Sequence, residues 1–196
     1  MQDSNHDENM GNAIKPAGVV SESLVKRSFR AEDYSTVKSF MLRIFPMIYP
    51  DYFYREIATR KHWTRGIFCE EGKLVGLIVA SFAEAYESIA TGGPPTRDCG
   101  KPFRLMYIYS LGVDRSYRRL KLSSTLMNEC IEKARTRRAS GLYLHVMAEN
   151  IGAISLYKKL GFETYGFYPS YYKSWGTDGF GKIISLDRKM TLTLGI

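Results

Sequence analysis

The sequence predicts one α/β domain, built on a mixed sheet with helices on both faces. Its 196 residues are enough for one sizeable core but hardly for two. Strand-like segments, aromatic and β-branched, are interspersed with segments of helical spacing. The two kinds do not alternate one to one, so a doubly wound parallel sheet is not expected.

The first residues are expected to lie outside the fold. Residues 1–22 carry four acids against one base and few apolar residues, which predicts a flexible tail before a single domain at 23–196. The polar and acidic start also excludes a secretory signal peptide. We therefore expect a cytoplasmic protein.

The first half of the domain is expected to form a strand, two helices and a hairpin. A proline disfavours helical backbone in the residue before it, so the first helix should stop before Pro46. The turn Glu71-Gly72 separates the two arms of the hairpin. The expected elements are a strand near Leu24–Phe29, a helix near Glu32–Ile44, a short helix after Pro50, and hairpin strands at 65–70 and 73–83.

The second half begins with a long turn-rich segment and then returns to regular structure. Ala85–Arg104 is rich in Gly and Pro, which predicts an exposed loop between strands. Apolar residues every four positions from Leu122 to Ala134 predict a helix that ends before Gly141. The remaining expected elements are strands at Met106–Val113, Leu142–Met147, Glu163–Tyr168 and Lys182–Leu186, and a helix at Ala153–Leu160 with Gly161 after its end.

Composition limits the possible functions. The net charge of +8 favours an anionic ligand or surface, but the charge alone does not indicate which one. The three cysteines, Cys69, Cys99 and Cys130, are far apart and lack zinc-ligand spacing, so neither a disulfide framework nor a structural metal is indicated. The longest apolar stretch, Leu74–Ala83, is ten residues, whereas a membrane-spanning helix needs about 20.

Much of the positive charge lies where a strand leads into a helix. Asp114–Arg138 contains eight bases and three acids, a net +5 of the chain's +8. Free N–H groups at a helix N-terminus bind phosphate, and Arg115, Arg118, Arg119 and Lys121 would add charge around it. A charge run of this kind is also common on a solvated helix face, which spacing alone favours.

Two central strands carry polar side chains that admit two interpretations. His145 lies on the opposite strand face from Leu144 and Val146, and Tyr107 lies in another expected strand. Each is either a packed core residue with a satisfied hydrogen bond or a catalytic group. Asn150 and Tyr157 likewise either cap and pack the following helix or contact a ligand.

Together these segments resemble the GNAT superfamily of acetyl-coenzyme A dependent N-acetyltransferases. Asn150-x-x-Ala153-Ile154-x-x-Tyr157-x-x-x-Gly161-Phe162 looks like the second cofactor segment of the superfamily. Tyr117-Arg-Arg-Leu120 looks like the entry to its pyrophosphate loop. The resemblance implies the GNAT fold, with a mostly antiparallel central sheet, and acetyl-CoA as co-substrate.

Four further phrases narrow the resemblance to protein N-terminal acetyltransferases, closest to the NatF type and next to the NatE catalytic subunit. They are Phe45-Pro46-x-x-Tyr49-Pro50-Asp51-x-x-Tyr54-Arg55, Tyr107-Ile-x-Ser-Leu-Gly-Val113, Tyr143-Leu-His-Val146, and Pro169-x-Tyr171-Tyr172 with Asp178-Gly-Phe180. They occur in order, and the resemblance runs from about Leu24 to Leu186, so the combination is more specific than any one phrase.

The resemblance assigns roles to named residues. Tyr107 and His145 are the catalytic candidates, acting through ordered water. The pantetheine arm would lie on the backbone of Leu111, Gly112 and Val113, with Asn150 and Tyr157 near the sulfur. The pyrophosphate would contact Arg118, Arg119, Leu120, Lys121, Leu122, Ser123 and Ser124, and the peptide N-terminus would contact Phe45, Pro46, Tyr49, Tyr109, Tyr171 and Tyr172. No metal is expected.

Two features depart from the family pattern. The pyrophosphate loop of the family has small residues, mainly glycine, where this chain has Lys121 and Ser123. In addition, NatF-like proteins use an extra C-terminal segment to attach to Golgi membranes, and this chain stops at Ile196. Golgi association is therefore not carried over.

The expected activity is acetylation of the free α-amino group of protein N-termini, with Met as first residue because an aromatic slot suits an apolar side chain. Two alternatives stay open: a lysine side-chain acetyltransferase and a catalytically weak acetyl-CoA-binding protein. A nucleic-acid-binding module is disfavoured, since the bases gather in one loop and helix without a binding motif beside them.

Overall fold

The computed structural model describes residues 23–84, 104–172 and 177–186. Within them, a seven-stranded sheet has the strand order β1-β2-β3-β4-β5-β7-β6. All neighbouring strands are antiparallel except β4 and β5, which run parallel. The predicted mixed sheet is confirmed. The predicted tail at 1–22 and the loop expected after Glu84 lie outside the described residues.

The elements follow the predicted order. The strands are β1 (Val25–Arg27), β2 (Trp63–Phe68), β3 (Leu74–Glu84), β4 (Arg104–Val113), β5 (Gly141–Met147), β6 (Glu163–Tyr172) and β7 (Thr177–Ser185). The helices are α1 (Tyr34–Ile44), α2 (Asp51–Ala58), α3 (Leu122–Thr136) and α4 (Ile151–Lys159), with short 3₁₀ turns η1 (Ala31–Asp33) and η3 (Arg115–Tyr117).

The differences from the predicted boundaries have local causes. Helix α4 begins at Ile151 because the Asn150 side chain accepts a hydrogen bond from the Ala153 N–H at 3.1 Å, and it ends before Gly161, whose φ is +87°. Helix α3 ends at Thr136, earlier than expected, because Arg138 adopts a left-handed conformation. Strand β7 begins at Thr177, five residues before the predicted start at 182, because Thr177 already pairs with Tyr172 of β6.

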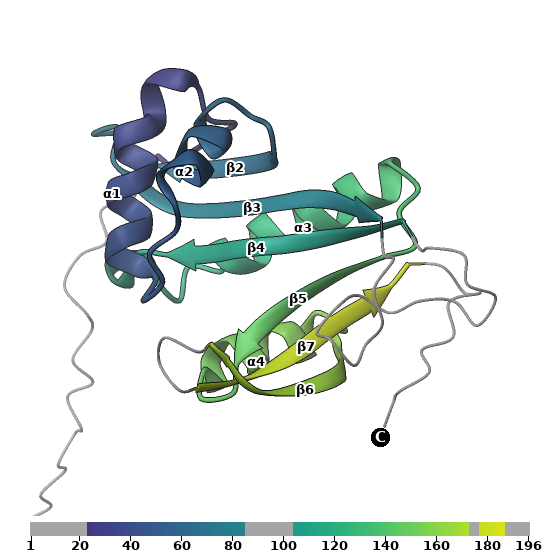
Figure 1. Cartoon of the computed structure of the whole chain (residues 1–196). Coiled ribbons are helices and arrows are strands. Elements are labelled where there is room, and N and C mark those ends of the chain that lie inside the picture. The colour runs from purple at the N-terminus through teal and green to yellow at the C-terminus, as the bar shows by residue number, and fades with distance from the viewer. Residues whose placement is uncertain (1–22, 85–103, 173–176, 187–196) are drawn as a thin grey trace, which may run out of the picture.

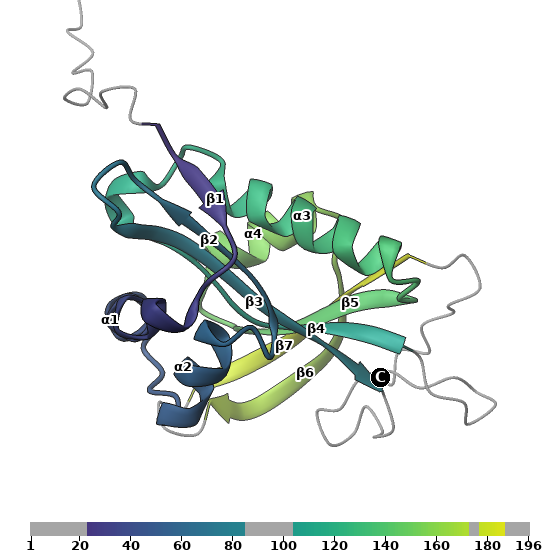
Figure 2. The ribbon, with the colours of Figure 1, turned by 90° about the horizontal axis from the view of Figure 1, so that it is seen from above.

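Two apolar layers cover the sheet. Helices α1 and α2 lie on one face, and α3 and α4 lie on the other (Figure 2). The first layer is centred on Phe40, Tyr54 and Leu77. The second joins the apolar stripe of α3, including Leu126 and Cys130, to β4 and β5. The helical spacing in the sequence therefore did identify the core-facing side of α3.

The two parallel strands separate partway along their length. Their pairing runs from Leu105 with Gly141 to Ile108 with Leu144 and goes no further. Beyond this point β4 and β5 diverge, as Figure 1 shows. On its other side β4 pairs with β3 as far as Val113, with an irregularity between Val79 and Ala80 that leaves Tyr109 without a partner in the register. Among the strands that the structure describes, the end of β4 is therefore paired on one side only, and its other edge faces the opening.

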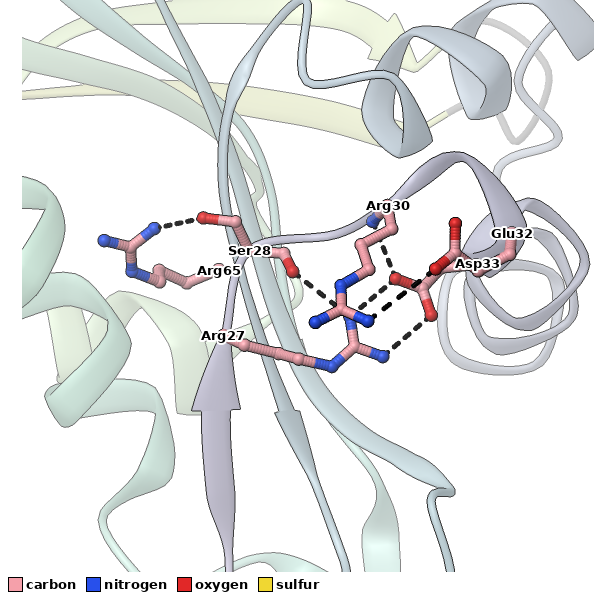
Figure 3. A network of polar contacts seen from close by, with 6 residues as sticks. All are labelled: Arg27, Ser28, Arg30, Glu32, Asp33 and Arg65. Carbon is pink, nitrogen blue, oxygen red and sulfur yellow. Dashed lines mark hydrogen bonds and ion pairs between the residues drawn. The ribbon is translucent and has the colours of Figure 1, made fainter.

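The edge strand β1 is tied to the first helical layer by a polar network (Figure 3). The Arg27 guanidinium donates to both carboxylate oxygens of Asp33, at 2.6 and 2.8 Å, and the Arg30 N–H donates to Asp33 at 2.7 Å. Asp33 is buried, and its hydrogen bond from Arg27 lowers the pKa of the carboxyl. This bidentate pair fixes where the chain leaves the sheet to begin α1.

No helix in the described ranges is long and apolar enough to span a bilayer.

Candidate functional site

A cavity of about 660 Å³ lies where β4 ends and α3 begins. It extends from the free edge of β4 to the first turns of α3 and α4. Its lining includes these predicted cofactor residues: Leu111, Gly112, Val113, Arg118, Arg119, Lys121, Leu122, Ser123, Ser124, Asn150 and Tyr157. Leu120, predicted with them, does not line this cavity, and its side chain is exposed.

The loop before α3 turns at two left-handed residues. Arg119 has φ 69° and Lys121, the residue that precedes the helix, has φ 58°. A left-handed conformation costs a non-glycine residue about 1–2 kcal/mol, so the glycine of the family pattern would relieve strain at Lys121. Ser123 lies within α3 and carries no such strain. Of the two departures from the family pattern, only the one at Lys121 therefore strains the backbone.

The first turn of α3 faces the larger cavity with backbone N–H groups. Lys121 is the N-cap residue, and in the described part of the chain its side chain makes no capping hydrogen bond to this turn. Ser123 and Ser124 are half-buried in the cavity wall. The N-terminus of a helix attracts anions through these N–H groups and the helix dipole. Exposed Arg118 and Arg119 add positive charge at the mouth of the same cavity.

A second cavity of about 210 Å³ adjoins the first on the side of β5. Phe45, Leu111, Asn150 and Tyr157 line both cavities. The second cavity also contains every predicted catalytic and substrate residue: Tyr107, His145, Phe45, Pro46, Tyr49, Tyr109, Tyr171 and Tyr172. Residues from four separate parts of the chain therefore meet in one slot.

The segment between α1 and α2 forms one wall of the slot. Helix α1 ends at Ile44, before Pro46 as predicted, and the Phe45 ring lies against Gly112 of β4. A Cβ on Gly112 would lie 2.7 Å from the Phe45 ring, so glycine is what permits this approach. The Tyr49 ring stacks on Phe53 at 4.8 Å, and its hydroxyl lies 3.1 Å from Ser110 Oγ. Tyr49 is thereby held rigidly at the slot.

The opposite wall comes from the end of β6. The Ser170 N–H donates to Asp178 at 2.8 Å, and this bond shapes the turn before Tyr171 and Tyr172. A Cβ on Gly179 would lie 3.0 Å from Tyr171 Cβ, so a glycine next to Asp178 allows Tyr171 to pack closely against this strand. The tyrosine pair and the Asp-Gly phrase noted in the sequence thus form a single local structure.

The two catalytic candidates are in contact. The Tyr107 hydroxyl lies 3.2 Å from His145 Nδ1, and the Tyr171 ring stacks on the imidazole at 4.4 Å between ring centres. Burial, then the neighbouring Tyr171, raises the pKa of Tyr107 well above its usual value. Tyr107 is therefore a protonated phenol at neutral pH, able to relay a proton but not to act as a phenolate base.

Sequence reasoning missed a third partner of the imidazole. The Tyr165 hydroxyl lies 3.3 Å from His145 Nε2, so both ring nitrogens of His145 face a phenol. A Cβ on Gly181, which pairs with His145 in the sheet, would lie 2.5 Å from the Tyr165 ring. Only the pairing of β5 with β7 reveals this arrangement. Ser110 and Met147 also line the slot and were not predicted there.

The site is rich in hydroxyl groups and poor in metal ligands. Within the described part of the chain, no group of three His, Cys, Asp or Glu side chains is placed to hold a metal ion. Burial raises the pKa of Tyr157 to about 12, which keeps its hydroxyl protonated beside both cavities. The arrangement offers neutral hydrogen-bonding groups, backbone amides and an imidazole.

Comparisons with known proteins show which family the chain is similar to. Residues 34–162 match the model of the acetyltransferase (GNAT) family. The chain is 29% identical over 167 residues to N-alpha-acetyltransferase 60 of Xenopus tropicalis, covering 83% of this chain and 68% of that protein. It is 27% identical over 186 residues to N-alpha-acetyltransferase 60 of Danio rerio, covering 89% and 74%.

Solved structures show the same fold. Arabidopsis thaliana NAA60 in complex with acetyl-CoA aligns with a TM-score of 0.72 at 24% identity, covering 84% of this chain and 100% of that one. Arabidopsis thaliana Naa50 in complex with the bisubstrate analogue CoA-Ac-MVNAL aligns with a TM-score of 0.65 at 24% identity, covering 84% and 99%.

Proposed function

Because the chain belongs to the GNAT acetyltransferase family, we propose that its adjoining cavities bind acetyl-CoA and a protein N-terminus, and that it transfers the acetyl group to the free α-amino group of a Met-starting chain. The predicted fold, family and enzyme class are confirmed. Both animal relatives are N-alpha-acetyltransferases. The observation that carries the proposal is the meeting of the two cavities where β4 and β5 separate, beside Tyr107 and His145.

The larger cavity has the features that acetyl-CoA requires. Its volume of about 660 Å³ lies within the range of cofactor sites. The unpaired edge at Leu111–Val113 offers backbone groups to the amides of the pantetheine arm, as an additional strand would. The N-terminus of α3, with Arg118 beside it, suits the pyrophosphate. When bound, acetyl-CoA supplies the acetyl group as an activated thioester.

The smaller cavity provides the groups needed to deprotonate an amine. A free α-amino group has a pKa of about 7.7–8.0, so a base has to remove only one proton from a partly ionised nucleophile. We assign this role to His145, with the protonated Tyr107 relaying the proton through ordered water. The amine would give its proton to His145 as its nitrogen forms the new bond to the carbonyl carbon. The carbon–sulfur bond would then break, and the sulfur would leave as a thiolate that takes up a proton to give the thiol.

The end of β4 and the tyrosine walls supply the remaining functions. A backbone N–H in Leu111–Val113, at the end of β4, would polarise the thioester carbonyl. The first side chain of the peptide would lie among Phe45, Tyr49 and Tyr172, whose aromatic surfaces favour an unbranched apolar residue such as Met. Neither function requires a charged side chain at the reacting centre.

A peptide library decides between the α-amino and lysine activities. Peptides with free and with blocked N-termini are incubated with acetyl-CoA, and mass spectrometry locates the acetyl group. We expect acetylation of free α-amino groups, highest on Met-starting peptides. Equal acetylation of lysine in blocked peptides would overturn the N-terminal assignment. Binding of acetyl-CoA without any product would instead indicate a catalytically weak binding protein.

A further inference from the structure

A third cavity, of about 450 Å³, lies beside the larger one and is strongly basic. Four of its lining residues carry positive charge, and Asp114 carries the single negative charge. The complete lining is Arg43, Ile44, Lys73, Asp114, Arg115 and Arg118. A concave surface with this excess of positive charge attracts an anion.

One buried carboxylate holds two of these bases in place. Asp114 is 7% exposed, accepts a hydrogen bond from Arg43 at 3.0 Å, and lies 3.8 Å from Lys73 Nζ. Arg43 comes from the last turn of α1 and Lys73 from the turn before β3, so Asp114 fixes bases from two separate elements. One negative charge cannot neutralise both bases together with the exposed Arg115 and Arg118.

The basic cavity adjoins the proposed cofactor cavity. Ile44 and Arg118 line both of them. The pyrophosphate already has a place at the N-terminus of α3, which leaves the basic cavity without an assigned ligand. CoA carries a third phosphate, on the 3′ position of its ribose. As a monoester with a second pKa near 6, it is largely dianionic at neutral pH, whereas each phosphate of the pyrophosphate bridge carries a single charge.

On this basis, and resting on the proposed function, we propose that Arg43, Lys73, Arg115 and Arg118 form a subsite for the 3′-phosphate of CoA. Arginine suits this ligand because its planar fork donates two hydrogen bonds to a phosphate. The subsite would add affinity and would select CoA over thioester carriers that lack the 3′-phosphate.

Calorimetric titration with CoA and with 3′-dephospho-CoA tests the proposal without relying on activity. The two ligands differ only at the phosphate in question. We expect the wild-type protein to bind CoA about tenfold more tightly, a difference of about 1.4 kcal/mol. Equal affinities in the wild-type protein would overturn the subsite and leave the proposed function intact. Binding of neither ligand would overturn both.

Variants locate the effect. In Arg43→Gln with Lys73→Gln, the ratio of the two dissociation constants should fall towards one. Lys133→Gln with Arg135→Gln removes two charges from the last turn of α3 and should leave the ratio unchanged. Because the first pair strips the partners from buried Asp114, Arg115→Gln serves as a second variant that keeps both ion pairs. Arg115→Gln should lower the ratio in a protein with unchanged thermal unfolding, and an unchanged ratio would overturn the subsite.

Inorganic phosphate distinguishes the 3′-phosphate from a separate anion. If the cavity accepts the 3′-phosphate, added phosphate should weaken the binding of CoA more than that of 3′-dephospho-CoA at the same ionic strength. If phosphate binds equally well to the free protein and to its CoA complex, the cavity holds an independent anion and the proposal is wrong.

Discussion

The hydroxyl of Tyr107 on β4 lies 3.2 Å from Nδ1 of His145 on β5, although 38 positions separate the two residues in the chain. The contact forms just beside the last paired residues of the two parallel strands, Ile108 and Leu144. Two side chains that, from their positions in the sequence, are either core residues or catalytic groups thus form one hydrogen-bonded pair at the opening of the sheet. Tyr165 closes the other side of the imidazole.

Removing either member of this pair should reduce turnover. We expect Tyr107→Phe and His145→Ala each to lower kcat by about 10²- to 10⁴-fold, the usual effect of losing a general base or its relay. Acetyl-CoA binding, measured by calorimetry, should be nearly unchanged because both side chains lie in the smaller cavity. Near-normal turnover by both folded variants would return the two residues to a purely structural role.

The tyrosine walls should determine peptide binding. Tyr49→Ala removes a ring that stacks on Phe53 and a hydroxyl beside Ser110, and Tyr172→Ala opens the other wall. Losing such contacts costs about 1–3 kcal/mol, so the KM for Met-starting peptides should rise about tenfold or more while acetyl-CoA affinity changes little. Steady-state kinetics with varied peptide measures this change.

Tyr52→Ala is the matched control for the slot variants. This tyrosine lies on α2, is 64% exposed and does not line the slot. We expect its KM to stay within about twofold of the wild type, as for most surface substitutions. A KM increase in Tyr52→Ala as large as in Tyr49→Ala would mean that the slot is not where the peptide binds.

Lys121 combines backbone strain with a favourable charge. Its left-handed backbone costs about 1–2 kcal/mol, whereas an ammonium near a diphosphate contributes about 1.5–3 kcal/mol at most. These effects oppose each other, so Lys121→Gly should change acetyl-CoA affinity less than tenfold, or about 1.4 kcal/mol. Binding should also weaken as salt concentration rises.

Lys121→Asn separates the two effects, because asparagine tolerates the left-handed region but carries no charge. Both variants remove the charge, so if the charge governs affinity they should bind acetyl-CoA equally well. Weaker binding by Lys121→Asn than by Lys121→Gly would show that backbone conformation governs affinity. If the wild type shows no binding at millimolar acetyl-CoA and Lys121→Gly restores it, the loop is defective and the chain is not an active transferase.

The Arg27–Asp33 pair should make stability depend on pH in the acid range. The pKa of Asp33 is lowered in the folded protein, so its contribution is present above the ordinary value of about 3.9 and is lost as pH falls through the folded value. Asp33→Asn should cost about 1–3 kcal/mol of unfolding free energy at pH 7. Denaturant unfolding should show this cost shrinking below pH 4.

Glu32→Gln provides the control for the acid-range prediction. Glu32 neighbours Asp33 but is exposed, and its carboxylate lies 3.8 Å from exposed Arg30. We expect a change within about 0.5 kcal/mol at pH 7, as for other surface positions. An equal loss in both variants would show that general charge balance, and not the bidentate pair, stabilises the junction.

The order of elements and the family were determined by the sequence itself. Period-2 and period-3.6 patterns report which side of a strand or helix is apolar, and this information is local. Pro46, Gly161 and the Asn150 cap set element ends through backbone geometry, which is also local. The phrases that resemble the family lie within single segments, so they too could be read without a structure.

Relations between segments were decided only by the tertiary structure. The Tyr165 contact with His145 depends on strand β7 lying between β5 and β6, and no spacing in the chain encodes that order. The left-handed backbone of Lys121 is fixed by how the loop joins β4 to α3. The basic cavity around Asp114 brings together three segments whose charges look unrelated in the sequence. Electrostatic and packing energies depend on distances through space, and the packing of the sheet and helices determines those distances.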